Sequence, residues 1–172
     1  GKNITRMHLD ETSFIRSHYK FTIDSTFPPT TAAATTAFLS AKYPIETGWL
    51  GWMQYMPKYD RNMIMFLGVD YNTGEKIEEN GRAIALNLFP YKSIIDLIKE
   101  CSPETQALNI SQYPVQVKGP KKLYQGRKAL KKALKGVESE FIYFYWGDPD
   151  FEMHQNGIDA KVVNRTVKRI YI

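Results

Sequence analysis

The sequence has little cysteine and no long apolar run. Its one cysteine, Cys101, excludes both an intramolecular disulfide and a thiolate metal cluster, and is compatible with a reducing compartment such as the cytoplasm. The longest apolar run, residues 141–146, has the length of a strand, whereas a bilayer-spanning helix needs about 20 apolar residues. The sequence therefore predicts neither a disulfide scaffold nor a membrane span.

Internal repeats and low-complexity linkers are also lacking. Hydrophobic residues make up 43% of the 172 residues, which is enough for a compact core, so we expect residues 1–172 to form a single domain. Because the chain begins with Gly1 and not with Met, we expect it to be cut from a longer protein. The net charge of +5 is compatible with anionic substrates and with nucleic acid, and does not distinguish between them.

The order of local patterns predicts an α/β fold. Strand-like segments alternate with helix-like segments, which is typical of a mostly parallel sheet flanked by helices. The expected strands are 21–27, 82–89, 113–117 and 141–146, with 63–67 as a strand or a helix end, and the expected helices are 32–42, 91–101, 121–135 and 159–172. The run 141–146 is continuously apolar, as in a strand buried on both faces. Chemistry in such sheets gathers at the carboxyl ends of strands.

Two threonines lie at the first such strand end. Thr30 and Thr31 follow the expected strand and precede the expected helix 32–42. The free N–H groups and the dipole of a helix N-terminus favour an anion such as phosphate. A hydroxyl placed there can attack phosphorus when a metal ion lowers its pKa. The simpler interpretation is that Thr30 or Thr31 only caps the helix.

Carboxylates and an imidazole follow the run 141–146. The expected loop holds Asp148, Asp150, Glu152 and His154. Asp150 and His154 are four residues apart, and carboxylate oxygen together with imidazole nitrogen suits an ion such as zinc. The alternative is an acidic surface turn that happens to contain a histidine.

Both segments resemble a known family. Residues 27–31 (Phe-Pro-Pro-Thr-Thr) through 40–48 (Ser-Ala-Lys-Tyr-Pro-Ile-Glu-Thr-Gly) resemble the nucleophile segment of nucleotide pyrophosphatases/phosphodiesterases in the alkaline phosphatase superfamily. That segment reads aromatic-Pro-Thr-Lys-Thr-Phe-Pro-Asn, a helix, then Gly-x-Tyr-Pro-x-x-His-Gly, and its nucleophilic threonine falls on Thr31. Residues 143–157 are similar to the family's strand followed by Glu-Pro-Asp-x-x-x-His-x-x-Gly, which places metal ligands on Asp150 and His154.

The resemblance implies a metal-dependent hydrolase of small-molecule phosphate esters or diesters. Thr31 is then both nucleophile and metal ligand, and a phospho-threonine intermediate forms. Asp150 and His154 hold one of two divalent ions, expected to be zinc, and the remaining ligands lie outside this chain. His8 and His18 match no ligand position. The resemblance therefore implies that the 172-residue chain is a fragment of a larger catalytic domain and is inactive alone.

The sequence departs from the family at three positions. Ala34 replaces an asparagine that helps to hold the phosphoryl oxygen, and Ala32 replaces the aromatic residue on which a nucleotide base can stack. Thr47 replaces the histidine of the Tyr-Pro segment. The phosphoryl pocket thus lacks one side-chain donor, and a nucleotide substrate is not implied.

Two other functions compete with hydrolysis. Residues 118–135 carry a basic stripe near Tyr124, a composition typical of contacts to a nucleic-acid backbone. Such a stripe is more often the solvated face of an amphipathic helix, with Leu123, Leu130 and Leu134 on the other side. The aromatic stretch from Trp49 to Met56 either lines a partner surface or forms a core cluster beneath a loop.

Overall fold

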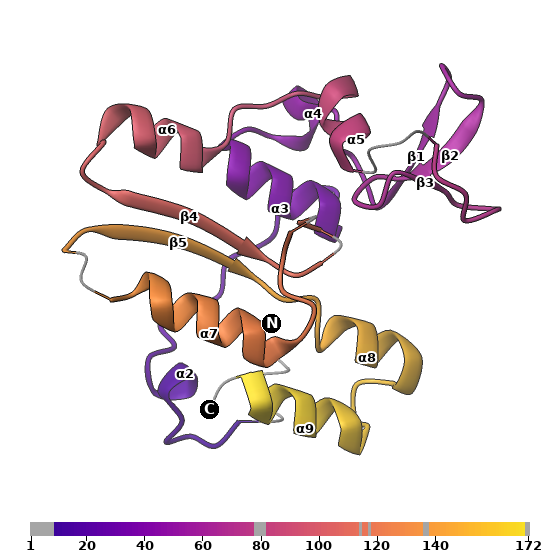
Figure 1. Ribbon diagram of the computed structural model, residues 1–172. Helices are drawn as coiled ribbons and strands as arrows, with labels where there is room; N and C mark the ends of the chain where they lie inside the picture. Colours follow the sequence, from indigo (N-terminus) through magenta and orange to yellow (C-terminus); the bar gives the residue numbers. More distant parts are fainter. Residues whose placement is uncertain (1–8, 78–81, 114, 117, 136–137, 171–172) are drawn as a thin grey trace. The chain divides into compact units, whose positions relative to one another are not determined.

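The computed structural model describes residues 9–77, 82–113, 115–116, 118–135 and 138–170, with the backbone alone for 82 and 83. Contacts divide the chain into two compact units, each described by itself: the first 24 residues with those from Tyr145 on, and Ser25–Phe144. The described helices are α2 (Phe14–Ser17), α3 (Thr31–Ser40), α4 (Pro44–Thr47), α5 (Arg82–Leu88), α6 (Ile94–Cys101), α7 (Leu123–Ala133), α8 (Asp150–Asn156) and α9 (Lys161–Ile170) (Figure 1). The described strands are β1 (Met53–Met56), β2 (Arg61–Ile64), β3 (Val69–Asp70), β4 (Gln106–Ser111) and β5 (Glu140–Tyr145).

In the larger unit, β1, β2 and β3 form an antiparallel sheet in that order. Met53 pairs with Ile64, and Met63 pairs with Asp70. The Asp70 carboxylate closes the turn after β3, because its Oδ1 accepts from the amides of Asn72 and Thr73, each at 2.8 Å.

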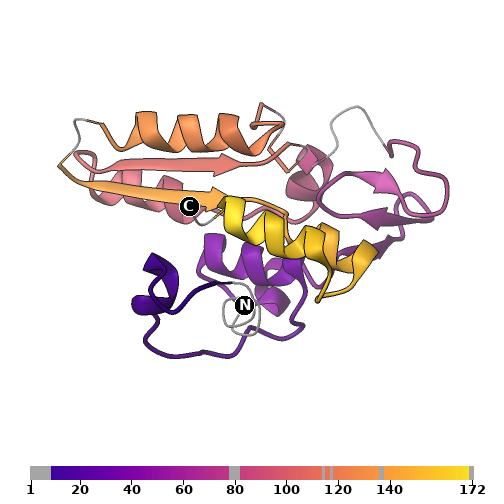
Figure 2. The ribbon, with the colours of Figure 1, turned by 90° about the horizontal axis from the view of Figure 1, so that it is seen from below.

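A second, parallel pair of strands lies in the same unit. β4 and β5 run in the same direction, and the Gln106 amide donates to the Ser139 carbonyl at 3.0 Å (Figure 1). On β5, Tyr143 stacks against Phe38 of α3 with ring centroids 5.6 Å apart. The next residue, Phe144, lies against Gly126 of α7. Successive strand residues point to opposite faces, so α3 and α7 cover opposite faces of the pair (Figure 2).

The core of the larger unit is built around Trp49. Its side chain is fully buried, with Phe66 and Met63 beside it in the same cluster, and its Nε1 donates to the Phe89 carbonyl at 3.0 Å. Met56 is also buried, whereas Trp52 is 42% exposed. The aromatic stretch is thus partly core, and its exposed members lie at the edge.

The smaller unit has its own small core. Leu9 packs with Val163 and Val167 of α9, and α8 packs against α9. The Arg16 guanidinium donates to the Leu9 carbonyl at 2.9 Å, which ties α2 to the start of the described chain. In both units the described helices are too short or too polar to cross a membrane.

The predicted mostly parallel sheet is wrong. The described strands form the antiparallel β1–β2–β3 sheet and the parallel pair β4–β5. Residues 82–88 form α5 instead of a strand, since their alanine and leucine residues favour a helix. Residues 21–27 pair with no described strand and leave Phe21 and Phe27 at 75% and 86% exposed. Of the predicted strand 113–117, residues 114 and 117 lie outside the described residues and the others form turns.

The four helix predictions are confirmed, as α3, α6, α7 and α9, with ends that differ by up to three residues. Residues 171 and 172 of the predicted helix 159–172 lie outside the described residues. α6 begins where Ser93 and Asp96 exchange hydrogen bonds between side chain and backbone, a strong helix start signal. The strand predicted at 141–146 is confirmed as β5, with the bounds Glu140–Tyr145. Helices cover both of its faces, but its apolar residues are half-buried and not fully buried.

Replacement of Gly48 tests the packing around Trp49. Gly48 has φ +73°, and a Cβ there would lie 2.4 Å from Phe89 Cδ1, whereas Gly74 has φ +71° with nothing within 4 Å. We expect G74A to cost roughly 1–2 kcal/mol for the left-handed backbone. G48A should cost roughly 1–3 kcal/mol more because the methyl group overpacks the core. Thermal unfolding measures both; equal losses would show that Phe89 does not constrain this position.

The Asp70 turn predicts a loss of stability in acid. The Thr73 amide, assisted by the Asn72 amide and opposed by burial, holds the pKa of Asp70 below its usual value. The carboxylate therefore stabilises the fold above about pH 4, and this contribution is lost as the pH falls through the folded pKa. Thermal unfolding at pH 7 and pH 3 should show a smaller difference in D70N than in wild type. D159N, at an exposed residue, is the control; an unchanged difference in D70N would contradict the assignment.

Candidate functional site

The two adjacent threonines have different environments. Thr30 is the N-cap of α3, and its Oγ1 accepts from the Ala33 amide at 3.5 Å. Thr31 is the first helical residue and is half-buried, and no described residue makes a hydrogen bond to its hydroxyl. The capping role thus belongs to Thr30, and the Thr31 hydroxyl remains available.

The start of α3 also offers free donors. The amides of Thr31 and Ala32 find no acceptor among the residues that the structure describes. The first turn carries no acidic side chain that would offset the positive end of the helix dipole. An anion bound here would accept from backbone N–H groups beside the Thr31 hydroxyl.

Two departures from the family motif take structural roles. Ala32 is fully buried in the cluster around Trp49, so this position presents no surface for a base. Thr47 is buried; its hydroxyl donates to the Pro44 carbonyl at 3.3 Å and accepts from the Trp49 amide at 3.4 Å. The segment around Thr47 therefore shapes the core behind α3.

The segment predicted to be a loop after 141–146 contains a helix. α8 begins at Asp150, has Asp150 and Glu152 in its first turn, and ends before Gly157, which has φ +81°. Acidic residues at the start and glycine just past the end are the usual helix boundary signals, and they outweigh the loop prediction.

The helix brings Asp150 and His154 together. They lie one turn apart, and Asp150 Oδ2 is 3.5 Å from His154 Nε2, with side chains 64% and 80% exposed. The two neighbouring acids have other partners, since Asp148 accepts from Trp146 Nε1 at 3.2 Å and Glu152 accepts from Asn156 Nδ2 at 3.1 Å. Asp150 and His154 are thus the two side chains of the segment that face each other.

This spacing fits two ligands of one zinc ion. Ligands at about 2.1 Å from zinc with a tetrahedral angle lie about 3.4 Å apart, close to the Asp150–His154 distance. Across the described ranges no group of three or more His, Cys, Asp or Glu side chains converges, so the pair would supply two of the ligands. The alternative is an ion pair between adjacent turns that forms when His154 is protonated.

Tyr145 is a neighbour that the sequence did not single out. Burial raises the pKa of Tyr145, and the negative charge of Asp150 raises it further. The phenol therefore stays protonated at neutral pH beside the pair. The sequence feature that could have pointed to Tyr145 is its position at the end of the predicted strand, five residues before Asp150.

Thr31 belongs to the larger unit, whereas Asp150 and His154 belong to the smaller one. Each half of the predicted site is therefore described within its own unit. His18, which matches no ligand position, caps α2 and stacks on Phe14 at 4.3 Å, and His8 lies outside the described residues.

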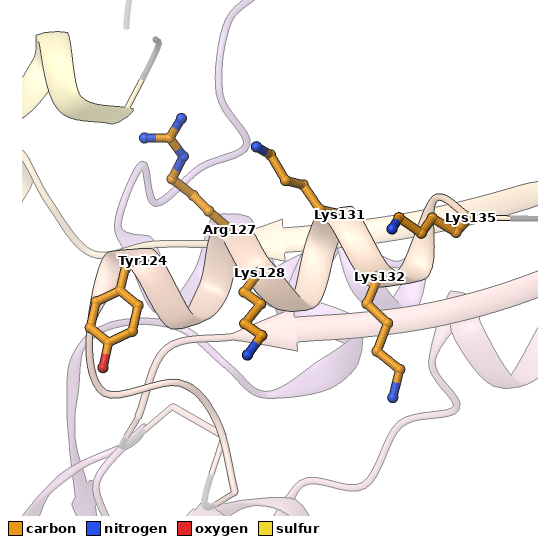
Figure 3. Close-up of a pocket in the computed structure, with 6 residues that line it drawn as sticks. All are labelled: Tyr124, Arg127, Lys128, Lys131, Lys132 and Lys135. Atoms are coloured by element: carbon orange, nitrogen blue, oxygen red, sulfur yellow. The ribbon is translucent and has the colours of Figure 1, made fainter.

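Half of the cations in the basic stripe predicted at 118–135 lie on α7, and the others lie just before it or just after it. Six side chains line an open hollow of about 600 Å³ along the outer side of the helix (Figure 3). They are Tyr124, Arg127, Lys128, Lys131, Lys132 and Lys135.

Comparison with known proteins finds no similar protein. The chain matches no protein-family model, no curated protein and no solved structure. Functional inference therefore depends on the residues and their geometry.

The two threonines predict different stability effects. T30A removes the side-chain acceptor of the helix cap and should lower the free energy of unfolding by about 1 kcal/mol. T31A removes an unpartnered hydroxyl and should change it by less than about 0.5 kcal/mol. Chemical denaturation of both variants measures the difference; a larger loss in T31A would mean that Thr31 is the structural residue.

Proposed function

We propose that this chain is part of a metal-dependent hydrolase of phosphate esters or diesters in which Thr31 is the nucleophile. The observation that carries the proposal is the separation of roles at the start of α3. Thr30 caps the helix, while the adjacent Thr31 hydroxyl and the first amides remain free of described partners. The resemblance of both motif segments to the phosphodiesterase family supports the same residue.

The helix start binds the substrate phosphate. Phosphoryl oxygens accept from the amides of Thr31 and Ala32, and the dipole of α3 stabilises their charge. Thr31 Oγ attacks phosphorus, a new O–P bond forms, and the bond from phosphorus to the leaving oxygen breaks; the proton lost by the Thr31 hydroxyl passes to that oxygen, which departs as an alcohol. Water then attacks the phospho-threonine, which releases phosphate or a phosphate monoester and restores the hydroxyl.

Asp150 and His154 would hold a divalent ion, which we propose to be zinc. Their separation of 3.5 Å and their mixed oxygen and nitrogen donors fit that metal. When bound, the ion would supply positive charge to a phosphoryl oxygen that it contacts. Tyr145 remains a neutral donor beside Asp150.

The substrate we propose is a small phosphate ester or diester without a requirement for a nucleotide base. Ala32 stands where the family has its stacking aromatic residue, and it is buried.

Turnover tests the nucleophile. In the full-length protein that contains this chain, T31A should reduce hydrolysis of a p-nitrophenyl phosphodiester to background while zinc content stays unchanged. T30A is the matched control, since it removes the neighbouring hydroxyl and should retain most of the turnover. Turnover by T31A close to that of wild type would exclude the proposed nucleophile.

The metal ligands are tested on the chain itself. Added Zn²⁺ should shift the NMR resonances of the His154 ring and leave those of His18 unchanged, and D150A should weaken this response. Equal shifts of both rings would indicate nonspecific binding and would contradict the metal site.

A further inference from the structure

The positive charge of the chain is concentrated in one segment. Eight of its 23 Lys and Arg residues lie between Lys118 and Lys135, and this segment contains no Asp or Glu. Because the whole chain has 18 acidic residues, the remaining residues carry net negative charge. The excess that gives the protein its pI of about 9.2 thus comes from this segment.

The cations of α7 occupy its outer face. The opposite side of the helix contacts the strand pair, because buried Gly126 lies against Phe144 and Gln106 Nε2 donates to the Ala133 carbonyl at 3.2 Å. Figure 3 shows Arg127 and Lys131 pointing to one side of the helix and Lys128 and Lys132 to the other. The open hollow is thus lined by cations from both sides of the helix.

Charge balance within the protein does not explain this face. Lys128, Lys131, Lys132 and Lys135 form no ion pair with a described residue. Lys128 is followed by Lys131 and Lys132 at spacings of three and four, where like charges repel. A helix that needs only solvation usually mixes both signs, whereas α7 has no acidic residue. The helix dipole favours Lys131 and Lys132 in the last turn and does not extend to Lys128.

We propose that this face, the α7 trough formed by the six lining residues, binds single-stranded nucleic acid along the helix axis. The cations from both sides of the helix contact the phosphates, and Tyr124, which is 64% exposed at one end, stacks on a base. A positively charged groove with an exposed aromatic side chain is the usual arrangement for single strands. An anionic membrane fits less well, because the six lining residues include no Leu, Ile, Phe or Trp that would insert between lipids.

The trough is separate from the start of α3. Phe38 of α3 and Gly126 of α7 contact opposite faces of the β4–β5 pair through Tyr143 and Phe144. Binding in the trough therefore needs neither Thr31 nor a metal ion, and it goes beyond the proposed hydrolase function.

Fluorescence anisotropy of a labelled 12-nucleotide DNA with the 172-residue chain, in EDTA, tests the proposal. Four lysine–phosphate contacts give a slope of log affinity against log salt of about −3, so affinity should fall roughly 50-fold between 50 and 200 mM salt. K128E/K132E should lower affinity at least about tenfold. K161E/K168E, which makes the same charge change at exposed lysines of α9, should stay within about twofold.

The role of Tyr124 separates nucleic acid from other polyanions. Y124A should lower affinity for the oligonucleotide at least about fivefold and leave affinity for inorganic polyphosphate unchanged, while Y124F retains both. Thermal unfolding checks that each variant folds. If K128E/K132E does not fold, K128Q/K132Q replaces it and should lose less affinity than the charge reversal but more than the control.

Three results would overturn the proposal. The first is that K128E/K132E binds the oligonucleotide as tightly as wild type does, or that K161E/K168E loses as much affinity as K128E/K132E. The second is no effect of Y124A on oligonucleotide binding, which would leave a general polyanion surface. The third is binding to phosphatidylserine vesicles in the absence of oligonucleotide binding.

Discussion

The larger unit depends on the burial of one indole. Trp49 is fully enclosed, and its N–H is satisfied by the carbonyl of Phe89, which lies 40 residues further along the chain. A buried indole N–H without an acceptor would cost about 1–3 kcal/mol, so this bond holds the two segments at a fixed distance. Gly48 allows the approach, because a side chain there would meet the Phe89 ring.

The same core positions the candidate nucleophile. Ala32 belongs to the cluster around Trp49, and Ala33 is equally buried, so the first turn of α3 is fixed from the inside. Thr30 and Thr31 are each partly exposed at the start of this anchored turn. A helix start held in this way offers its amides to a ligand without having to order them first, which is the condition for efficient anion binding.

The sequence predicted the helices better than the sheet. The helices α6, α7 and α9 have local apolar spacing, and α3 is rich in alanine; α3 and α6 also have side-chain caps, so all four could be predicted. Strand pairing depends on distant partners, and residues 82–88 are short and apolar enough to suit a strand or a helix. For the site, the sequence shows the spacing of Asp150 and His154 but predicts that both lie in a loop. The structure shows the helix α8, which places both side chains on one face. The cap could be assigned to Thr30 only from coordinates.

The alternation of Tyr143 and Phe144 on β5 has a mechanical consequence. Tyr143 packs against α3 and Phe144 packs against α7, so the register of the strand depends on contacts with both helices. Sliding β5 by a single position would turn both rings to the wrong side at once. The two aromatic contacts therefore fix the register of β5. Substitutions on the solvent side of α7 can change the charge of that helix without disturbing the packing of α3.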